Sequence, residues 1–229
     1  GPLRTFTVGE RLAFEVFWIG VPVGLGELWV KEKVQVNGRE AFHVVAVAET
    51  NEFLSKIYPV RDEVHTYIDV ETFYSLQFEK KVSEGRYRAD EKIVFDWKKK
   101  KGFYESLHNK SVKEFDIAGP VHDILSAFYW FRLQPVQEGQ GVKVTVNSEE
   151  KEWEVEIQVL RRESKEVRGG GVIDTFLVEP KAALRGVFYK RGRTWVHFTA
   201  DEKRIPILVT FHTPFGPVTG VLKNPSMPV

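Results

Sequence analysis

The chain of 229 residues contains no cysteine, which excludes disulfide bonds, cysteine-ligated zinc, iron–sulfur sites and thiol nucleophiles. It also lacks an excess of positive charge, because 33 basic residues face 32 acidic ones and leave a formal net charge of +1. Non-specific nucleic-acid binding needs a positive field, so no nucleic-acid partner is expected. No window approaches the roughly 18 uninterrupted apolar residues of a membrane-spanning helix, so no transmembrane segment is predicted.

Recognisable catalytic motifs are missing as well. There is no HExxH spacing and no Gly-x-Ser-x-Gly elbow, and the glycine run 169–171 lacks the lysine and following helix of a phosphate-binding loop. His122–Asp123 and His197 with Asp201 are the only histidine–carboxylate pairs close in sequence, and helix capping and a turn explain them more simply. We therefore predict no catalytic residues, no metal site, no cofactor and no enzymatic activity.

The sequence is rich in alternating apolar and polar residues, with 42% hydrophobic and 13% aromatic residues available for a core. Such alternation, broken by turn residues at short intervals, is typical of an all-β sandwich or barrel. Asn37–Gly38 predicts a type I′ hairpin turn between strands 28–36 and 41–49. A turn is expected over 20–24 and a loop with one helical turn over 51–59. Further strands are predicted at 12–18, 63–68, 74–82, 86–95, 103–108, 111–117, 142–146, 153–159, 172–178, 194–199, 205–212 and 218–222.

One helix interrupts the strands. Gly119–Pro120 breaks the alternation, and Asp123 is a suitable N-cap for a helix over about 123–132. Residues 124–131 carry no charge on any face, whereas a surface helix needs a polar side. We therefore expect the helix to be enclosed by the concave side or the mouth of a curved sheet.

These patterns predict a mainly β fold, namely a large antiparallel, strongly curved sheet or barrel-like β-domain with one buried apolar helix. About a dozen strands follow one another without a linker, and open sheets of that size curl or close because strand twist accumulates. We interpret Gly1–Pro2 as the remnant of a removed expression tag and residues 3–229 as a single β-rich domain.

Several short segments resemble a bacterial family of exported proteins known as domain of unknown function 3108. They are Gly9–Leu12 with Gly20 and Gly24, Tyr67–Asp69, Phe95–Asp96, Asp123–Ala127, Trp195–Asp201, Arg204–Pro206 and Pro214–Gly216. The resemblance extends from about Gly9 to Leu222. It implies a periplasmic or outer-membrane-associated location, with a signal peptide or lipid anchor at the native N-terminus, and it brings no activity and no catalytic residues.

Two features suggest binding. The first is a set of aromatic side chains predicted to line the concavity as a ligand-binding surface, with core filling as the alternative: Phe14, Trp18, Phe42, Phe78, Phe95, Phe128, Phe131, Trp153 and Trp195. Tyr87 is also predicted to face inward. The second is a basic cluster that would contact an anionic group or a partner protein, with a solvated loop as the alternative: Lys181, Arg185, Lys190, Arg191 and Arg193.

The leading hypothesis is a non-enzymatic envelope protein that binds an apolar or lipid-like ligand in the concavity beside the helix. The alternative is an envelope scaffold with a packed interior that docks another envelope protein. A hydrolase comes third, because it would need His122 or His197 in a cleft with a nucleophile in reach. A large apolar cavity inside the sheet favours the first hypothesis, and a filled interior favours the second.

Overall fold

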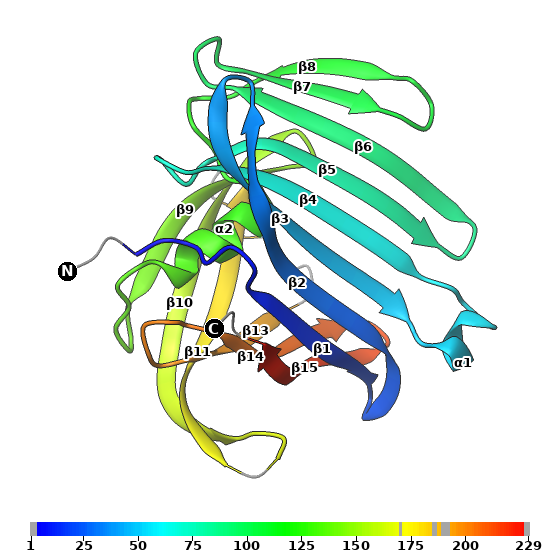
Figure 1. The fold of residues 1–229 in the computed structure, drawn as a ribbon, viewed down its shortest axis with the longest axis vertical. Helices are drawn as coiled ribbons and strands as arrows, with labels where there is room; N and C mark the ends of the chain where they lie inside the picture. The colour runs from blue at the N-terminus through cyan, green and yellow to red at the C-terminus, as the bar shows by residue number, and fades with distance from the viewer. Residues whose placement is uncertain (1–3, 170, 185–186, 189–192, 227–229) are drawn as a thin grey trace.

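A computed structural model of the chain describes residues 4–169, 171–184, 187–188 and 193–226 (Figure 1). It contains two helices, α1 (Glu52–Ser55) and α2 (Ile124–Arg132), among many strands. The strands are β1 (Arg11–Trp18), β2 (Val21–Val36), β3 (Arg39–Thr50), β4 (Arg61–Asp69), β5 (Ser75–Glu84), β6 (Tyr87–Asp96), β7 (Lys101–Ser106), β8 (Val112–Asp116), β9 (Gly141–Ser148), β10 (Lys151–Glu166), β11 (Val172–Leu184), β12 (Val187–Phe188), β13 (Thr194–Thr199), β14 (Pro206–Thr213) and β15 (Gly216–Ser226). The predicted mainly β class is confirmed.

All the strands belong to one antiparallel sheet that curls strongly and does not close. Its order is β8-β7-β6-β5-β4-β3-β2-β1-β15-β14-β13-β11-β10-β9, and β12 pairs with β11 off this path. The first eight strands form a meander, and β1 then pairs with β15, so strands from the two ends of the chain lie side by side in the middle of the sheet. Figure 1 shows the two halves of the sheet facing each other across α2.

The turns follow from local chemistry, with one correction. Asn37 and Gly38 have φ of 50° and 78°, so the predicted type I′ turn is confirmed. The expected turn over 20–24 is wrong: Ile19 and Gly20 alone make the turn, and β2 begins at Val21. Gly24 lies inside β2, where a Cβ atom would come within 2.2 Å of the Glu49 carbonyl oxygen, so this glycine permits close approach of β3 rather than a bend.

A short segment before α2 links the two halves where the sheet stays open; we call this place the seam. The Ser75 N–H donates to the Val121 carbonyl at 2.9 Å, which fastens the segment to the start of β5. On its other side, the His122 N–H donates to Thr145 at 3.3 Å, and the Asn147 N–H donates to the His122 carbonyl at 2.7 Å. His122 thus pairs with β9 in an isolated parallel bridge.

Helix α2 fills the space between the two halves, as its uncharged sequence predicts. Tyr129 has no exposed surface and packs with Val30, Phe42 and Ile68 of the first half. Phe131, on the other side of the helix, packs against Val159, Val178 and Phe198 of the second half, and Phe128 contacts both clusters. Among the described residues, no helix is long and apolar enough to cross a membrane.

The segment before β1 crosses α2 and holds it in place (Figure 1). The Phe6 ring makes edge-to-face contacts with Phe42, Phe73 and Tyr129, at centroid distances of 5.2, 5.3 and 5.6 Å. Further along, the Gly9 N–H donates to Val30 at 2.7 Å. Residues 6–10 therefore form a strap over the helix, which we call the N-terminal strap.

Candidate ligand-binding cleft at the seam

A cleft lies at the seam and has a volume of about 330 Å³. Its lining includes Tyr74, His122 and Trp130 from the first half of the chain and from α2. The remaining lining residues come from the edge of the second half: Lys143, Val144, Thr145, Glu154, Val155, Glu156 and Lys181. The cleft therefore opens where the curled sheet fails to meet itself.

The edge of β9 gives this cleft free main-chain groups. In an antiparallel pair, alternate residues direct their N–H and C=O groups away from the neighbouring strand. Thr145 and Asn147 face away from β10, because they exchange hydrogen bonds with His122. By the same alternation, the N–H and C=O groups of Lys143 face the cleft, at a position on β9 that the bridge to His122 does not reach.

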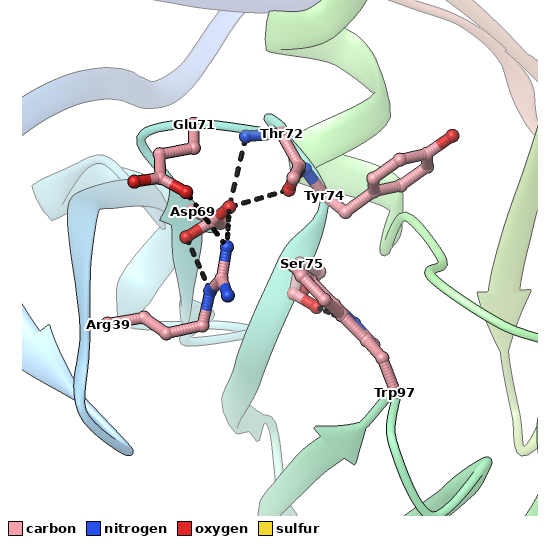
Figure 2. Close-up of polar contacts among 7 residues, drawn as sticks. All are labelled: Arg39, Asp69, Glu71, Thr72, Tyr74, Ser75 and Trp97. Carbon is pink, nitrogen blue, oxygen red and sulfur yellow. Dashed lines mark hydrogen bonds and ion pairs between the residues drawn. The ribbon is translucent and has the colours of Figure 1, made fainter.

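The Tyr74 side of the cleft is positioned by a polar turn between β4 and β5 (Figure 2). The Arg39 guanidinium donates two hydrogen bonds of 2.9 Å to the carboxylate of Asp69, which also accepts the Thr72 N–H at 3.0 Å and the Thr72 hydroxyl at 2.7 Å. Burial raises the pKa of Asp69, but the hydrogen bonds from Arg39 and Thr72 together outweigh burial and hold this pKa below its ordinary value. The turn is thereby rigid, and the Tyr74 ring extends away from it.

His122 lies between two aromatic rings at the base of the cleft. Its ring centroid is 4.8 Å from that of Tyr74 and 5.4 Å from that of Trp130, and the residue is 1% exposed. Burial lowers its pKa from 6.5 to about 4, so the imidazole is neutral at pH 7. Its Nδ1 lies 3.1 Å from the Ser126 hydroxyl oxygen.

Ser126 and Asp123 form a capping box rather than an exposed catalytic pair. The Asp123 carboxylate accepts the Ser126 N–H at 2.7 Å, and the Ser126 hydroxyl oxygen accepts the Asp123 N–H at 2.9 Å. Asp123 also accepts hydroxyl hydrogen bonds of 2.5 Å from Thr66 and Ser75. Burial raises the pKa of Asp123, and the Ser126 side chain has no exposed surface. The predicted N-cap is confirmed, and the group next to His122 is a structural one.

The walls of the cleft combine apolar and charged groups. Val144 and Val155 are opposite each other on β9 and β10, and Trp130 is the half-buried aromatic residue of α2 that reaches this place. On the opposite face of the same strands, Lys143, Glu156 and Lys181 occupy one cross-strand row, so the cleft lining includes groups from both faces at the edge of β9. An amphipathic molecule matches such a lining better than a purely apolar one does.

The nine aromatic residues predicted to line the concavity do not come together in one place. Phe42, Phe95 and Phe131 are buried in three separate core clusters, and Phe14 belongs to a fourth. Phe78 and Phe128 are half-buried at the borders of these clusters, and Trp153 and Trp195 are half-buried on strands. The expected inward orientation is wrong for Trp18 and Tyr87, which are 43% and 60% exposed. Both residues lie at hairpin ends, where strand alternation no longer decides orientation.

The predicted basic cluster separates in the same way. Lys181 lines the seam cleft. Arg193 instead pairs with the buried carboxylate of Glu179 through two contacts of 3.0 Å, and its guanidinium lies over the Trp195 ring. Arg185, Lys190 and Arg191 lie outside the described residues.

Two other histidine groups have carboxylate neighbours. His197 Nε2 lies 2.6 Å from Glu163, and Asp201 caps the turn to β14 instead of approaching this histidine. His43 and His65 touch through Nε2 and Nδ1 at 2.7 Å, and His65 contacts Glu63. Within the described ranges, no group of three or more histidine and acidic residues is arranged to hold a metal ion.

Sequence reasoning missed most of the cleft. Tyr74, Lys143, Val144 and Val155 each read as ordinary strand residues, because only the folding of the sheet brings them to the seam. Trp130 carried one usable signal, since an apolar helix without a polar face must leave some aromatic surface at its border, and Lys181 carried another as a member of the predicted basic cluster.

The fold is a mainly β one, in which a single open and strongly curved antiparallel sheet surrounds a central helix. The chain belongs to the family described as "Protein of unknown function (DUF3108)", whose model matches residues 13–223. No curated protein matches the chain.

Solved structures resemble the fold at low sequence identity. A beta-barrel-like protein of domain of unknown function DUF1849 from Brucella abortus has a TM-score of 0.60 at 10% identity, over 96% of this chain and 98% of the other. A putative lipoprotein from Parabacteroides distasonis has a TM-score of 0.39 at 10% identity, over 94% of each chain. A putative exported protein with a YmcC-like fold from Bacteroides fragilis has a TM-score of 0.35 at 10% identity, over 96% and 97%.

Proposed function

We propose that this protein is a non-enzymatic component of the bacterial cell envelope that binds a small amphipathic, lipid-like ligand in the seam cleft. The observation that carries the proposal is the position of Trp130. It belongs to a helix whose Tyr129 and Phe131 side chains are buried between the two halves of the sheet, and it borders a cleft of about 330 Å³. Ligand sites in proteins typically span about 300–1,000 Å³, so the cleft accommodates one short acyl chain rather than a whole diacyl lipid.

The apolar and the basic residues of the lining would contact different ends of the ligand. The apolar end would lie against Trp130, Val144 and Val155, where aliphatic and aromatic carbon is already grouped. An anionic head group would lie against Lys143 and Lys181, which flank Glu156 in the cross-strand row. This replaces the earlier expectation of a ligand in the middle of the sheet, because packed side chains occupy that space on both sides of α2.

Binding of dodecanoate to the whole chain, measured by isothermal titration calorimetry, tests the proposal. Thr145→Trp places an indole in the charged half of the cleft, from an exposed position on the face of Lys143, and should abolish binding by occupying the head-group position, whereas Glu105→Trp, at an exposed position on β7, is the matched control. Replacing Lys143 and Lys181 together by glutamine should weaken binding about tenfold, as expected for the loss of charge-assisted contacts. Failure of the unmodified protein to bind the probe, or binding that survives Thr145→Trp, would refute the proposal.

A scaffold with a packed interior is the second candidate, and the filled space around α2 favours it. In that case α2 acts only as a plug, and a partner protein would dock on the outside. Affinity capture from an envelope fraction, repeated with Lys181→Gln and Arg193→Gln, tests whether these basic residues matter. An unchanged set of captured proteins counts against a role for them.

A further inference from the structure

One rim of the sheet exposes large apolar side chains on five successive connections. In an antiparallel meander, alternate connections lie at the same end of the strands. The β14–β15, β1–β2, β3–β4, β5–β6 and β7–β8 connections therefore share one rim, and those of β1–β2, α1 and β5–β6 lie on the right in Figure 1. We call the following residues the apolar rim: Trp18, Ile19, Val21, Phe53, Ile57, Tyr58, Tyr87, Leu107, Val112 and Phe215.

These apolar side chains are highly exposed, and they are grouped instead of scattered over the surface. Phe215 is 80% exposed, Phe53 and Ile57 are each 73% exposed, and Ile19 is 59% exposed. Among the described residues, ten of the sixteen exposed large hydrophobic residues belong to this rim. Soluble proteins rarely expose grouped apolar surface without an interaction that covers it.

The opposite rim of the same strands is polar, so the distribution is polarised. Its connections expose Asn37, Glu71, Lys98–Lys100 and Asp201–Lys203, and of the sixteen residues only Val172, at the start of β11, lies on this rim. The two rims are built from the same strands, so general surface composition does not explain the difference. The β9–β10 turn carries the acidic residues Glu149 and Glu150 and contributes no residue to the apolar rim.

Hydrogen bonds join neighbouring tips into one rigid edge. The Trp18 indole N–H donates to the Phe215 carbonyl at 3.0 Å, which links the β1–β2 and β14–β15 turns. Asn51, before α1, donates to the Pro22 carbonyl at 2.9 Å, and the Gly85 N–H donates to the Pro59 carbonyl at 2.8 Å. The exposed side chains are therefore held in place before anything binds them.

We infer that the apolar rim docks the protein on a lipid bilayer surface. The side chains project from separate turn tips with gaps between them. Such spaced side chains insert into a deformable acyl layer more readily than they pack against a protein surface of fixed shape. Trp18 and Tyr58 supply the amphipathic rings that favour the membrane interface. Exposed Lys56, Arg86 and Lys110 lie on the same connections, where they match anionic lipid head groups.

Flotation of the whole chain with vesicles of phosphatidylethanolamine and phosphatidylglycerol tests this inference. The unmodified protein should float with the vesicles, less so at high salt. A variant with Ile19→Ser, Phe53→Ser and Phe215→Ser removes one side chain from each of three tips, and the membrane partition coefficient should fall by about tenfold per side chain. The control variant, Ile124→Ser with Val172→Ser, changes residues that are 61% and 67% exposed off this rim and should float normally.

Two results would overturn the inference: absence of flotation of the unmodified protein, and equal flotation of the triple variant. A concentration-dependent dimer that does not float, and that the triple variant loses, would instead assign the rim to a second copy of the chain and also overturn it. The inference is independent of the seam cleft. The cleft-filling Thr145→Trp variant should still float, so the two proposals fail separately.

Discussion

Glu10 and Arg132 form a buried ion pair that ties the start of β1 to the end of α2. The two contacts between guanidinium and carboxylate are 2.6 and 2.8 Å, and the residues are 5% and 6% exposed. Arg132 also donates to the Arg204 carbonyl at 2.9 Å, so one side chain joins the N-terminal strap, the helix and the turn before β14.

Removing one member of this ion pair should lower the free energy of unfolding strongly, whereas replacing both members by apolar residues should lower it much less. Arg132→Met leaves a buried carboxylate without its cation, and we expect the free energy of unfolding to fall by about 3–5 kcal/mol. Glu10→Leu added to Arg132→Met should restore at least half of that loss, because no buried charge remains. Urea unfolding of the two single variants and the double variant measures the coupling, and simple addition of the single effects would contradict it.

The N-terminal strap should contribute strongly through Phe6. Phe6→Ala removes a buried ring that contacts three others, and the expected loss is about 3–5 kcal/mol in the free energy of unfolding. Val8→Ala, at a residue that is 42% exposed in the same segment, should change stability by less than about 0.5 kcal/mol. Equal midpoints for the two variants in thermal unfolding would show that the strap adds nothing.

His122 should make the fold acid-sensitive. Its pKa is about 4 in the folded chain against 6.5 in the unfolded chain, so between these values the unfolded state binds the extra proton. The stabilisation present above pH 6.5 is therefore lost as the pH falls toward 4, by about 3 kcal/mol. His122→Phe keeps an aromatic ring between Tyr74 and Trp130 and should flatten this pH dependence. His212→Gln serves as the comparison, and identical pH profiles for His122→Phe and the unmodified protein would rule out the assignment.

Repulsion between Glu84 and Asp62 should lower the stability of the fold as the pH rises. A hydrogen bond with Asp62 and then burial raise the pKa of Glu84 from 4.5 to about 7. The folded chain therefore binds the Glu84 proton more tightly than the unfolded chain does. The resulting stabilisation of the fold is fully present below pH 4.5 and is lost as the pH rises through 7. Asp62→Asn should raise the melting temperature at pH 8 more than at pH 5. A uniform shift at both values would exclude carboxyl repulsion as the cause.

Local signals in the sequence were sufficient for most elements and failed at long range. Asn37–Gly38 and Asp123 predicted a turn and a helix start because both depend on residues within four positions. Strands β2 and β10 run longer than alternation suggests, because bulges at Val30/Glu32 and Val159/Arg161 shift the pattern without ending the strand. The seam residues and the Glu10–Arg132 pair are set by packing across the whole chain, and no local pattern contains them.

The pairing of β1 with β15 has a consequence for the order of folding. Among the described strands, the two halves of the sheet are joined edge to edge only through this pair, and β1 is synthesised long before β15. A nascent chain can build the β1–β8 meander early, yet it cannot complete the sheet until β15 emerges. Because contacts this distant in sequence are slow to form, the late joining of the two ends should limit the folding rate. Until then the inner face of the meander stays uncovered, and the incompletely folded chain exposes apolar side chains that the finished fold buries.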